Sequence, residues 1–260
     1  MTTPASPLET LLLAIADDEL VLGHRDAEWT GHAPILEEDI AFSNIAQDEI
    51  GHSLVWYTAY EKLTGRSPDR VAFDRPWTAF TCSRFVSYPK GDFAYTVIRQ
   101  FLFDVAEEVR LRSFAAGSSP ALKAPAEKIL KEEAYHRLHT QGLVERLGNG
   151  TEESKRRMKA GLASAFPQAL GLFEPLAGEE ELVRSGVTVA SRELEQRWLA
   201  AVFPVLKGAS LDAPVREANG AFSPVVPGEY GGRTGRHTEH LEPLVRDLQS
   251  VYQIVPGGQW

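Results

Sequence analysis

The sequence predicts an all-α fold, a four-helix bundle with a long crossover and additional C-terminal helices, and three observations support it. Four stretches carry apolar residues at helical spacing, at about residues 7–26, 35–64, 92–116 and 121–147. A segment rich in proline and aromatic residues separates the second stretch from the third. Two Glu-x-x-His motifs lie in the second and fourth stretches. Because residues three apart share a helix face, each motif brings one carboxylate and one imidazole together.

The first two helices each carry a carboxylate within an apolar face. In the first helix Glu19 follows Ile15 by four residues, so both lie on one stripe. Pro34 lies between the first two helices and separates them, because proline has no amide hydrogen with which to continue a helix. In the second helix Glu49 and His52 lie among apolar residues at the same spacing. We therefore expect these polar side chains to point into a core.

The third and fourth helices repeat this arrangement after the crossover. The crossover, residues 66–90, is expected to be ordered, and a long crossover distinguishes ferritin-like bundles from simple up-and-down ones. Asp104 shares a stripe with Phe101 in the third helix, and the fourth carries Glu133 and His136 on its apolar face. The chain thus offers two similar helical hairpins.

The remainder of the chain is also predicted to be mainly helical. It contains helices at about 152–173 and 176–205, an irregular connection at 187–189, a glycine-rich loop at 228–235 and a last amphipathic helix at about 238–252. We expect a single ferritin-like domain over residues 1–260, with a core bundle at about 7–150 and a helical extension at about 151–260.

Composition excludes several classes of function. The net charge of −9 argues against a sequence-independent nucleic-acid binder, which needs a basic surface. The longest apolar run, residues 11–16, is far shorter than the roughly 20 residues of a membrane span. It lacks a basic n-region before it, so we expect no signal peptide. The single cysteine, Cys82, cannot form an internal disulfide or a cysteine-based metal site. We expect a cytoplasmic protein that binds neither nucleic acid nor membrane.

Six residues form the predicted metal site. A dinuclear iron site needs hard carboxylate oxygens together with imidazole nitrogens. Glu133 follows Glu49 by 84 residues and His136 follows His52 by the same number, which indicates two equivalent half-sites. The predicted ligands are Glu19, Glu49, His52, Asp104, Glu133 and His136. Glu107 is the alternative to Asp104, and Asp17 or Asp18 could replace Glu19 only if the first helix were rotated.

Less specific features of the sequence have two interpretations each. Asp48 and Glu132 precede the ligand glutamates and either accept the second ring N–H of a ligand histidine or are surface charges. The basic run at residues 155–157 is either a solvated face or a site for a phosphate-rich ligand such as coenzyme A. His237 and His240 could form another metal pair, but a helix N-terminus explains that stretch better.

Several segments resemble a known family over nearly the whole chain. They are LVLGHR at 20–25, EWTGHAP at 28–34, ERLGNGT at 145–151 and HTEHL at 237–241, with terminal Gln259 and Trp260. They resemble the C-type subunits of the phenylacetyl-CoA epoxidase family. The resemblance implies a ferritin-like bundle within a multicomponent monooxygenase that converts the ring of phenylacetyl-CoA to a 1,2-epoxide. It also implies dioxygen and NADPH-derived electrons, which a separate reductase subunit delivers.

The resemblance further implies a division of roles between subunits. In that family the A-type subunit holds the catalytic di-iron site, and C-type subunits are structural partners that have lost ligands. The six residues here instead match the A-type ligand pattern. We therefore expect a subunit of an oligomeric complex that pairs with an A-type subunit and itself binds a di-iron centre, with manganese or an empty site as alternatives. The competing hypotheses are a metal-free scaffold and a stand-alone ferritin-like di-iron protein.

Overall fold

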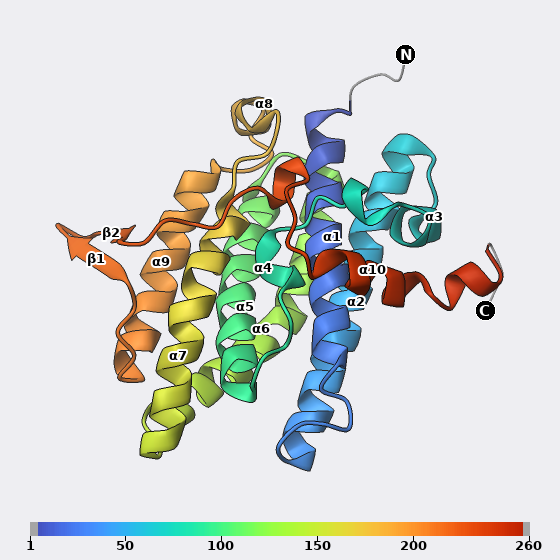
Figure 1. Ribbon diagram of the computed structural model, residues 1–260. Coiled ribbons are helices and arrows are strands. Elements are labelled where there is room, and N and C mark those ends of the chain that lie inside the picture. The colour runs from blue at the N-terminus through green and yellow to red at the C-terminus, as the bar shows by residue number, and fades with distance from the viewer. Residues whose placement is uncertain (1–4, 257–260) are drawn as a thin grey trace. The chain divides into compact units, whose positions relative to one another are not determined.

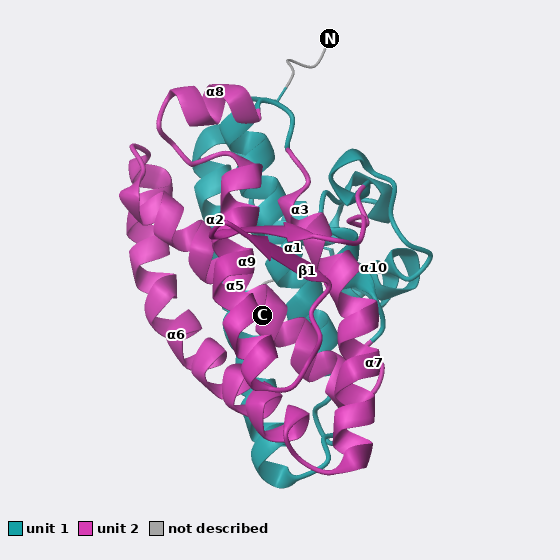
Figure 2. Ribbon diagram, turned by 90° about the vertical axis from the view of Figure 1, so that its left-hand side faces the viewer, with its two compact units in different colours: residues 1–89, 176–178, 231–260 teal, residues 90–175, 179–230 magenta. Residues whose placement is uncertain are grey.

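The computed structural model describes residues 5–256, and in it all four predicted bundle helices begin and end within one residue of their predicted boundaries. These helices are α1 (Pro7–Ala27), α2 (Leu36–Thr64), α5 (Phe93–Ala116) and α6 (Pro120–Gly148). By their internal contacts the residues form two compact units, coloured separately in Figure 2. The first comprises residues 1–89, 176–178 and 231–260, and the second comprises residues 90–175 and 179–230.

The first unit is built on the hairpin of α1 and α2, which lie side by side in opposite directions (Figure 1). The start of α1 is fixed by a capping box, in which the Ser6 hydroxyl accepts from the Glu9 amide and the Glu9 carboxylate accepts from the Ser6 amide. The end of α2 is fixed by Gly65, whose φ of 73° suits a residue without a side chain. Local signals in the sequence therefore define the start of α1 and the end of α2.

Shorter elements complete the first unit. They are α3 (Pro68–Phe73), η1 (Trp77–Ala79) and α4 (Arg84–Ser87) in the crossover, and η3 (Gly232–Thr234), α10 (Leu241–Gln249) and η4 (Tyr252–Ile254) near the C-terminus. Both α4 and α10 contact α1, and α3 contacts α2. The C-terminal segment thus returns to the N-terminal hairpin (Figure 1).

The second unit packs four long helices together. Its elements are α5 and α6, then α7 (Glu152–Ala169), η2 (Leu170–Phe173), α8 (Glu179–Arg184) and α9 (Ser191–Gly208), and the strands β1 (Val215–Ala218) and β2 (Ala221–Pro224). Trp198 of α9 anchors the packing, because its buried indole donates a 2.9 Å hydrogen bond to the Leu102 carbonyl of α5. Its ring also contacts Phe166 and Phe173 at centroid distances of 5.4 and 5.2 Å.

Several elements differ from the prediction: the crossover contains short helices, the helix expected at about 176–205 is interrupted between Arg184 and Ser191, and a β-hairpin is present. Residues 215–224 form an antiparallel hairpin in which Val215 pairs with Pro224 and Ala218 with Ala221. Asn219 and Gly220 form its turn with φ of 53° and 75°, the positive values that a two-residue hairpin turn requires. An Asn-Gly pair was therefore the available signal, but each strand is too short to show alternation.

Among residues 5–256, no helix is long and apolar enough to cross a membrane.

Candidate metal centre

The first unit brings three predicted ligands together at the interface of α1 and α2. Glu19, Glu49 and His52 are all buried, and each offers a ligand atom within 4.8 Å of the others. The Glu49 carboxylate lies 3.8 Å from Nδ1 of His52, as expected for residues three apart on a helix. Two carboxylates and one imidazole are donors that iron(II) and manganese(II) accept. The residues of this half-site therefore fit a divalent metal ion.

Close packing of the two helices explains how this half-site forms. Gly23 follows Glu19 by one helical turn and faces α2. A Cβ at Gly23 would lie 3.0 Å from the Ala46 carbonyl oxygen and 3.0 Å from Cβ of Glu49. The absence of a side chain at Gly23 lets the helices approach beside the ligands.

The two acidic residues that precede Glu19 are paired with arginines. Asp17 accepts a 2.6 Å hydrogen bond from the Tyr57 hydroxyl and forms an ion pair with Arg75. Asp18 forms an ion pair with Arg233, at 2.6 Å. Burial, reinforced by the negative charge of Asp17, raises the pKa of Tyr57 well above its ordinary value of 10.0. Tyr57 therefore stays protonated and donates to Asp17 at neutral pH.

The second unit contains the other half-site, between α5 and α6. Glu133 and His136 of α6 are buried, with the carboxylate 3.2 Å from Nδ1 of the imidazole. Asp104 of α5 offers an oxygen within 4.8 Å of a His136 nitrogen. The Asp104 carboxylate also accepts hydrogen bonds from the Thr140 hydroxyl, at 2.6 Å, and from the Gln100 amide, at 2.8 Å. These neutral donors orient Asp104 without neutralising its charge.

Glu107, the predicted alternative to Asp104, has a different environment. One oxygen of its buried carboxylate accepts a 2.8 Å hydrogen bond from the guanidinium of Arg110, which is also buried. An arginine partner competes with a metal ion for a carboxylate. Asp104 offers an oxygen within reach of His136 and stays the predicted ligand of α5.

The other residues considered from the sequence lie outside these two clusters. Asp48 and Glu132 are half-buried beside the ligand glutamates. The basic run on α7 forms exposed ion pairs: Lys155 with Glu152, and both Arg156 and Arg157 with Glu153. That run is a solvated face in this structure. The His237 ring donates to the Phe80 carbonyl at 2.9 Å, and His240 precedes α10.

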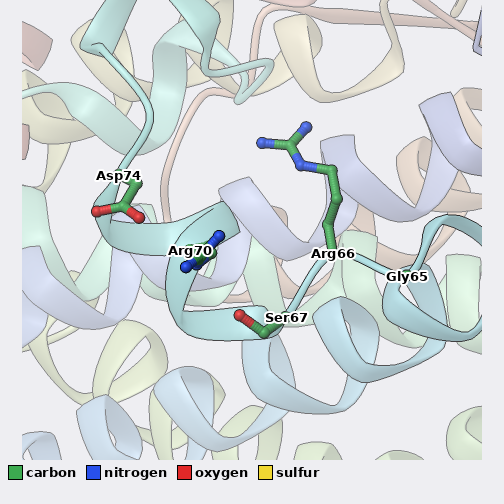
Figure 3. Close-up of a pocket in the computed structure, with 5 residues that line it drawn as sticks. All are labelled: Gly65, Arg66, Ser67, Arg70 and Asp74. Atoms are coloured by element: carbon green, nitrogen blue, oxygen red, sulfur yellow. The ribbon is translucent and has the colours of Figure 1, made fainter. Parts of the chain in front are cut away.

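A separate cavity of about 390 Å³ opens where α2 ends and α3 begins (Figure 3). It is lined by Gly65, Arg66, Ser67, Arg70 and Asp74. In Figure 3 the Arg66 side chain extends from the linker between α2 and α3, Arg70 lies on α3, and Asp74 lies on the side of Arg70 away from Arg66. The cavity shares none of its lining residues with the carboxylate and histidine clusters.

Sequence reasoning missed the arginines that pair with the two acidic residues before Glu19. Arg75 lies in the aperiodic crossover and Arg233 in the glycine-rich loop, so neither belongs to a repeating pattern. The available signal was indirect: two further buried carboxylates beside Glu19 require cationic partners. The consecutive acidic residues indicate that cationic partners are needed, but they do not identify Arg75 and Arg233.

Comparisons with known proteins agree with the fold. The sequence matches the family described as "Phenylacetic acid catabolic protein" over residues 2–260. A curated relative, the C-type subunit of 1,2-phenylacetyl-CoA epoxidase from Escherichia coli (strain K12), is 33% identical over 254 residues, 97% of this chain and 99% of the relative. A solved structure, "Protein 19 with aldehyde deformylating oxidase activity from Synechococcus", matches with a TM-score of 0.53 and 14% identity, covering 80% of this chain and 94% of its own. The predicted all-α, ferritin-like fold is confirmed.

Proposed function

Because the chain belongs to the phenylacetic acid catabolic protein family, we propose that it is the C-type subunit of a phenylacetyl-CoA epoxidase and pairs with a catalytic A-type subunit. The observation that carries this proposal is the relation to a curated C-type subunit along nearly the full length of both chains. In such a complex a separate reductase would supply electrons, and phenylacetyl-CoA would be the substrate.

An exposed apolar stripe on α2 supports pairing with another subunit. Four side chains on this stripe are exposed: Leu36 (71%), Ile40 (54%), Ile50 (41%) and Leu54 (53%). Their spacings of 4, 10 and 4 residues place them within a narrow arc of the helix surface. Two polar residues, Ser43 and Gln47, lie in this arc between the first apolar pair and the second. Exposed apolar side chains that share one helix face mark interaction sites, since leaving them in water is unfavourable. We propose that the A-type subunit packs against this stripe.

We also propose that the two half-sites hold a dinuclear centre, with iron as the first candidate and manganese as the second. Its ligands would be Glu19, Glu49, His52, Asp104, Glu133 and His136. The support is the matching composition of the half-sites, each with two carboxylates and one imidazole, and their burial. When bound, a dinuclear iron centre supplies activation of dioxygen. The carboxylates would balance the charge of the metal ions, and the histidines would leave coordination positions open.

One observation favours the alternative of a metal-free scaffold. Both oxygens of Asp104 accept hydrogen bonds, from Thr140 and Gln100. A hydrogen-bonded network could therefore persist at α5 without a metal ion. Against this, the buried carboxylates of Glu19 and Glu49 offer oxygens within 4.8 Å of each other, and two such charges repel and cost free energy when no cation is present.

Metal content and pairing are tested in the same purification. The chain is co-expressed in iron-replete medium with an A-type subunit, and each subunit is then isolated for elemental analysis. We expect about two irons per C-type chain, lost in the Glu49→Gln and His136→Ala double variant and retained in Glu37→Gln, an exposed position on α2. If the wild-type chain contains no metal but still pairs with the A-type subunit, the dinuclear centre is contradicted and the metal-free scaffold is supported.

The pairing surface has its own variants. Leu36→Asp combined with Leu54→Asp places two charges in the apolar stripe and should abolish co-elution with the A-type subunit in size-exclusion chromatography. Val225→Asp introduces the same charge at a residue that is 55% exposed elsewhere, and should leave co-elution unchanged. Co-elution of the double variant at wild-type levels would contradict the assignment of this surface.

A further inference from the structure

The three consecutive acidic residues of α1 point in three directions. Successive residues on a helix are separated by about 100°, so Asp17, Asp18 and Glu19 cannot face one partner. All three are completely buried. Asp17 and Asp18 are paired with Arg75 and Arg233, whereas Glu19 lies in the cluster with α2. Which acidic residue reaches the half-site therefore depends on the rotation of α1 about its axis.

Arg233 is well placed to fix that rotation. Its side chain is 3% exposed, and its guanidinium donates to both oxygens of Asp18, at 2.9 and 2.6 Å. The same guanidinium donates to the Ala14 carbonyl one turn earlier on α1, at 3.2 Å, and to the Thr81 carbonyl, at 3.0 Å. A forked contact of this kind restrains orientation as well as distance, which a single charge cannot do.

The loop that carries Arg233 is shaped for this contact by glycine. Gly231 has a φ of 122°, which strongly favours glycine, and a Cβ at Gly232 would lie only 2.4 Å from the Cys82 carbonyl oxygen. Two further contacts hold the loop at its C-terminal side: His237 with the Phe80 carbonyl at 2.9 Å, and the Thr238 hydroxyl with Ser87 at 2.8 Å. Residues 231–238 are therefore an anchored part of the first unit.

We propose that Arg233 is a positioning residue for the metal half-site. Its ion pair with Asp18 sets the rotation of α1 about the helix axis and so directs Glu19 toward Glu49 and His52. This inference rests on the proposed metal-binding function. It makes the C-terminal loop, more than 200 residues along the chain from α1, a determinant of metal affinity. Arg233 acts through Asp18 and does not itself contact the metal.

The test compares Co²⁺ binding by the isolated apo-chain with its Arg233→Lys variant. Lysine keeps the positive charge but cannot make the forked contact. We expect Co²⁺ affinity to fall by about 10–100-fold, the usual effect of removing support for a ligand, with an altered visible absorption spectrum. Asp18→Asn tests the same contact from the other side, because its amide nitrogen cannot accept a hydrogen bond, and it should give the same change.

A stability control separates positioning from general weakening. Val71→Ala removes buried volume in α3 and lowers the thermal midpoint, and it keeps the Val71 carbonyl, which accepts a hydrogen bond from Arg75. It should leave Co²⁺ affinity and the spectrum unchanged. Co²⁺ binding that is unaffected in both Arg233→Lys and Asp18→Asn, or reduced only as much as in Val71→Ala, overturns the positioning role alone. No Co²⁺ binding by the wild-type chain overturns the metal-binding function and the positioning role together.

Discussion

The ion pair between Asp17 and Arg75 gives the sharpest prediction for stability. Asp17 is completely buried and accepts hydrogen bonds from Tyr57, from Arg75 and from the Thr81 amide, the last at 2.7 Å. Asp17→Leu keeps the approximate shape but leaves a buried guanidinium without its charge partner. Removing one member of a buried pair costs about 3–5 kcal/mol, because the remaining charge is uncompensated. We expect that loss in the free energy of unfolding.

A double-mutant cycle tests the origin of the loss. Arg75→Met should also be strongly destabilising, while the double variant Asp17→Leu with Arg75→Met should lose at least about 2 kcal/mol less than the sum of the single losses. The assay is urea denaturation followed by circular dichroism. The slope of the unfolding free energy against urea concentration should be the same for all variants. Glu153→Gln on α7 is the exposed control and should leave the midpoint unchanged. Single losses below about 1 kcal/mol, or additive losses, would refute the reasoning.

Three further outcomes are expected. Gly232→Ala should destabilise the chain by about 1–3 kcal/mol in urea denaturation, because its Cβ would lie 2.4 Å from a backbone oxygen, whereas Gly142→Ala, with nothing within 4 Å, should be neutral or stabilising. In an alkaline titration followed by ultraviolet absorbance, Tyr57 should ionise only above pH 10.0, because burial and the charge of Asp17 raise its pKa. The contribution of this raised pKa to stability is complete below pH 10.0 and is lost as the pH rises through the raised pKa. Tyr57→Phe should remove this late transition. Trp198→Phe should cost about 1–3 kcal/mol in the same urea assay, since it removes the indole hydrogen bond to the Leu102 carbonyl and leaves space in the packing against Phe166 and Phe173; an unchanged midpoint would contradict that role.

The sequence was sufficient where the relevant information is local. Helix boundaries follow from caps and periodicity, as at Ser6 and Gly65. The Glu49 and His52 pair could be found because a three-residue spacing fixes a shared face before any tertiary structure is known. The competition between Asp104 and Glu107 could not be decided in this way. It depends on Arg110 and on neutral donors whose side-chain directions appear only after packing.

The contacts of the glycine-rich loop do not follow from local sequence patterns. Its composition predicts irregular backbone, which the structure contains, but not that Arg233 reaches Asp18. The same holds for Arg75, which lies 58 residues from its partner Asp17. Contacts between segments without periodicity depend on the whole fold, so a single sequence indicates that buried carboxylates need partners without naming them.

The discontinuity of the first unit has a consequence for synthesis on the ribosome. Asp18 and Arg233 are 215 residues apart, so the carboxylate emerges about 10–40 s before its guanidinium at elongation rates of about 5–20 residues per second. The second unit, residues 90–175 and 179–230, is nearly fully emerged before that pair can form. During this interval the N-terminal hairpin lacks the charge that balances Asp18 in its interior. The nascent hairpin therefore keeps one buried carboxylate without its arginine until the segment that carries Arg233 has emerged.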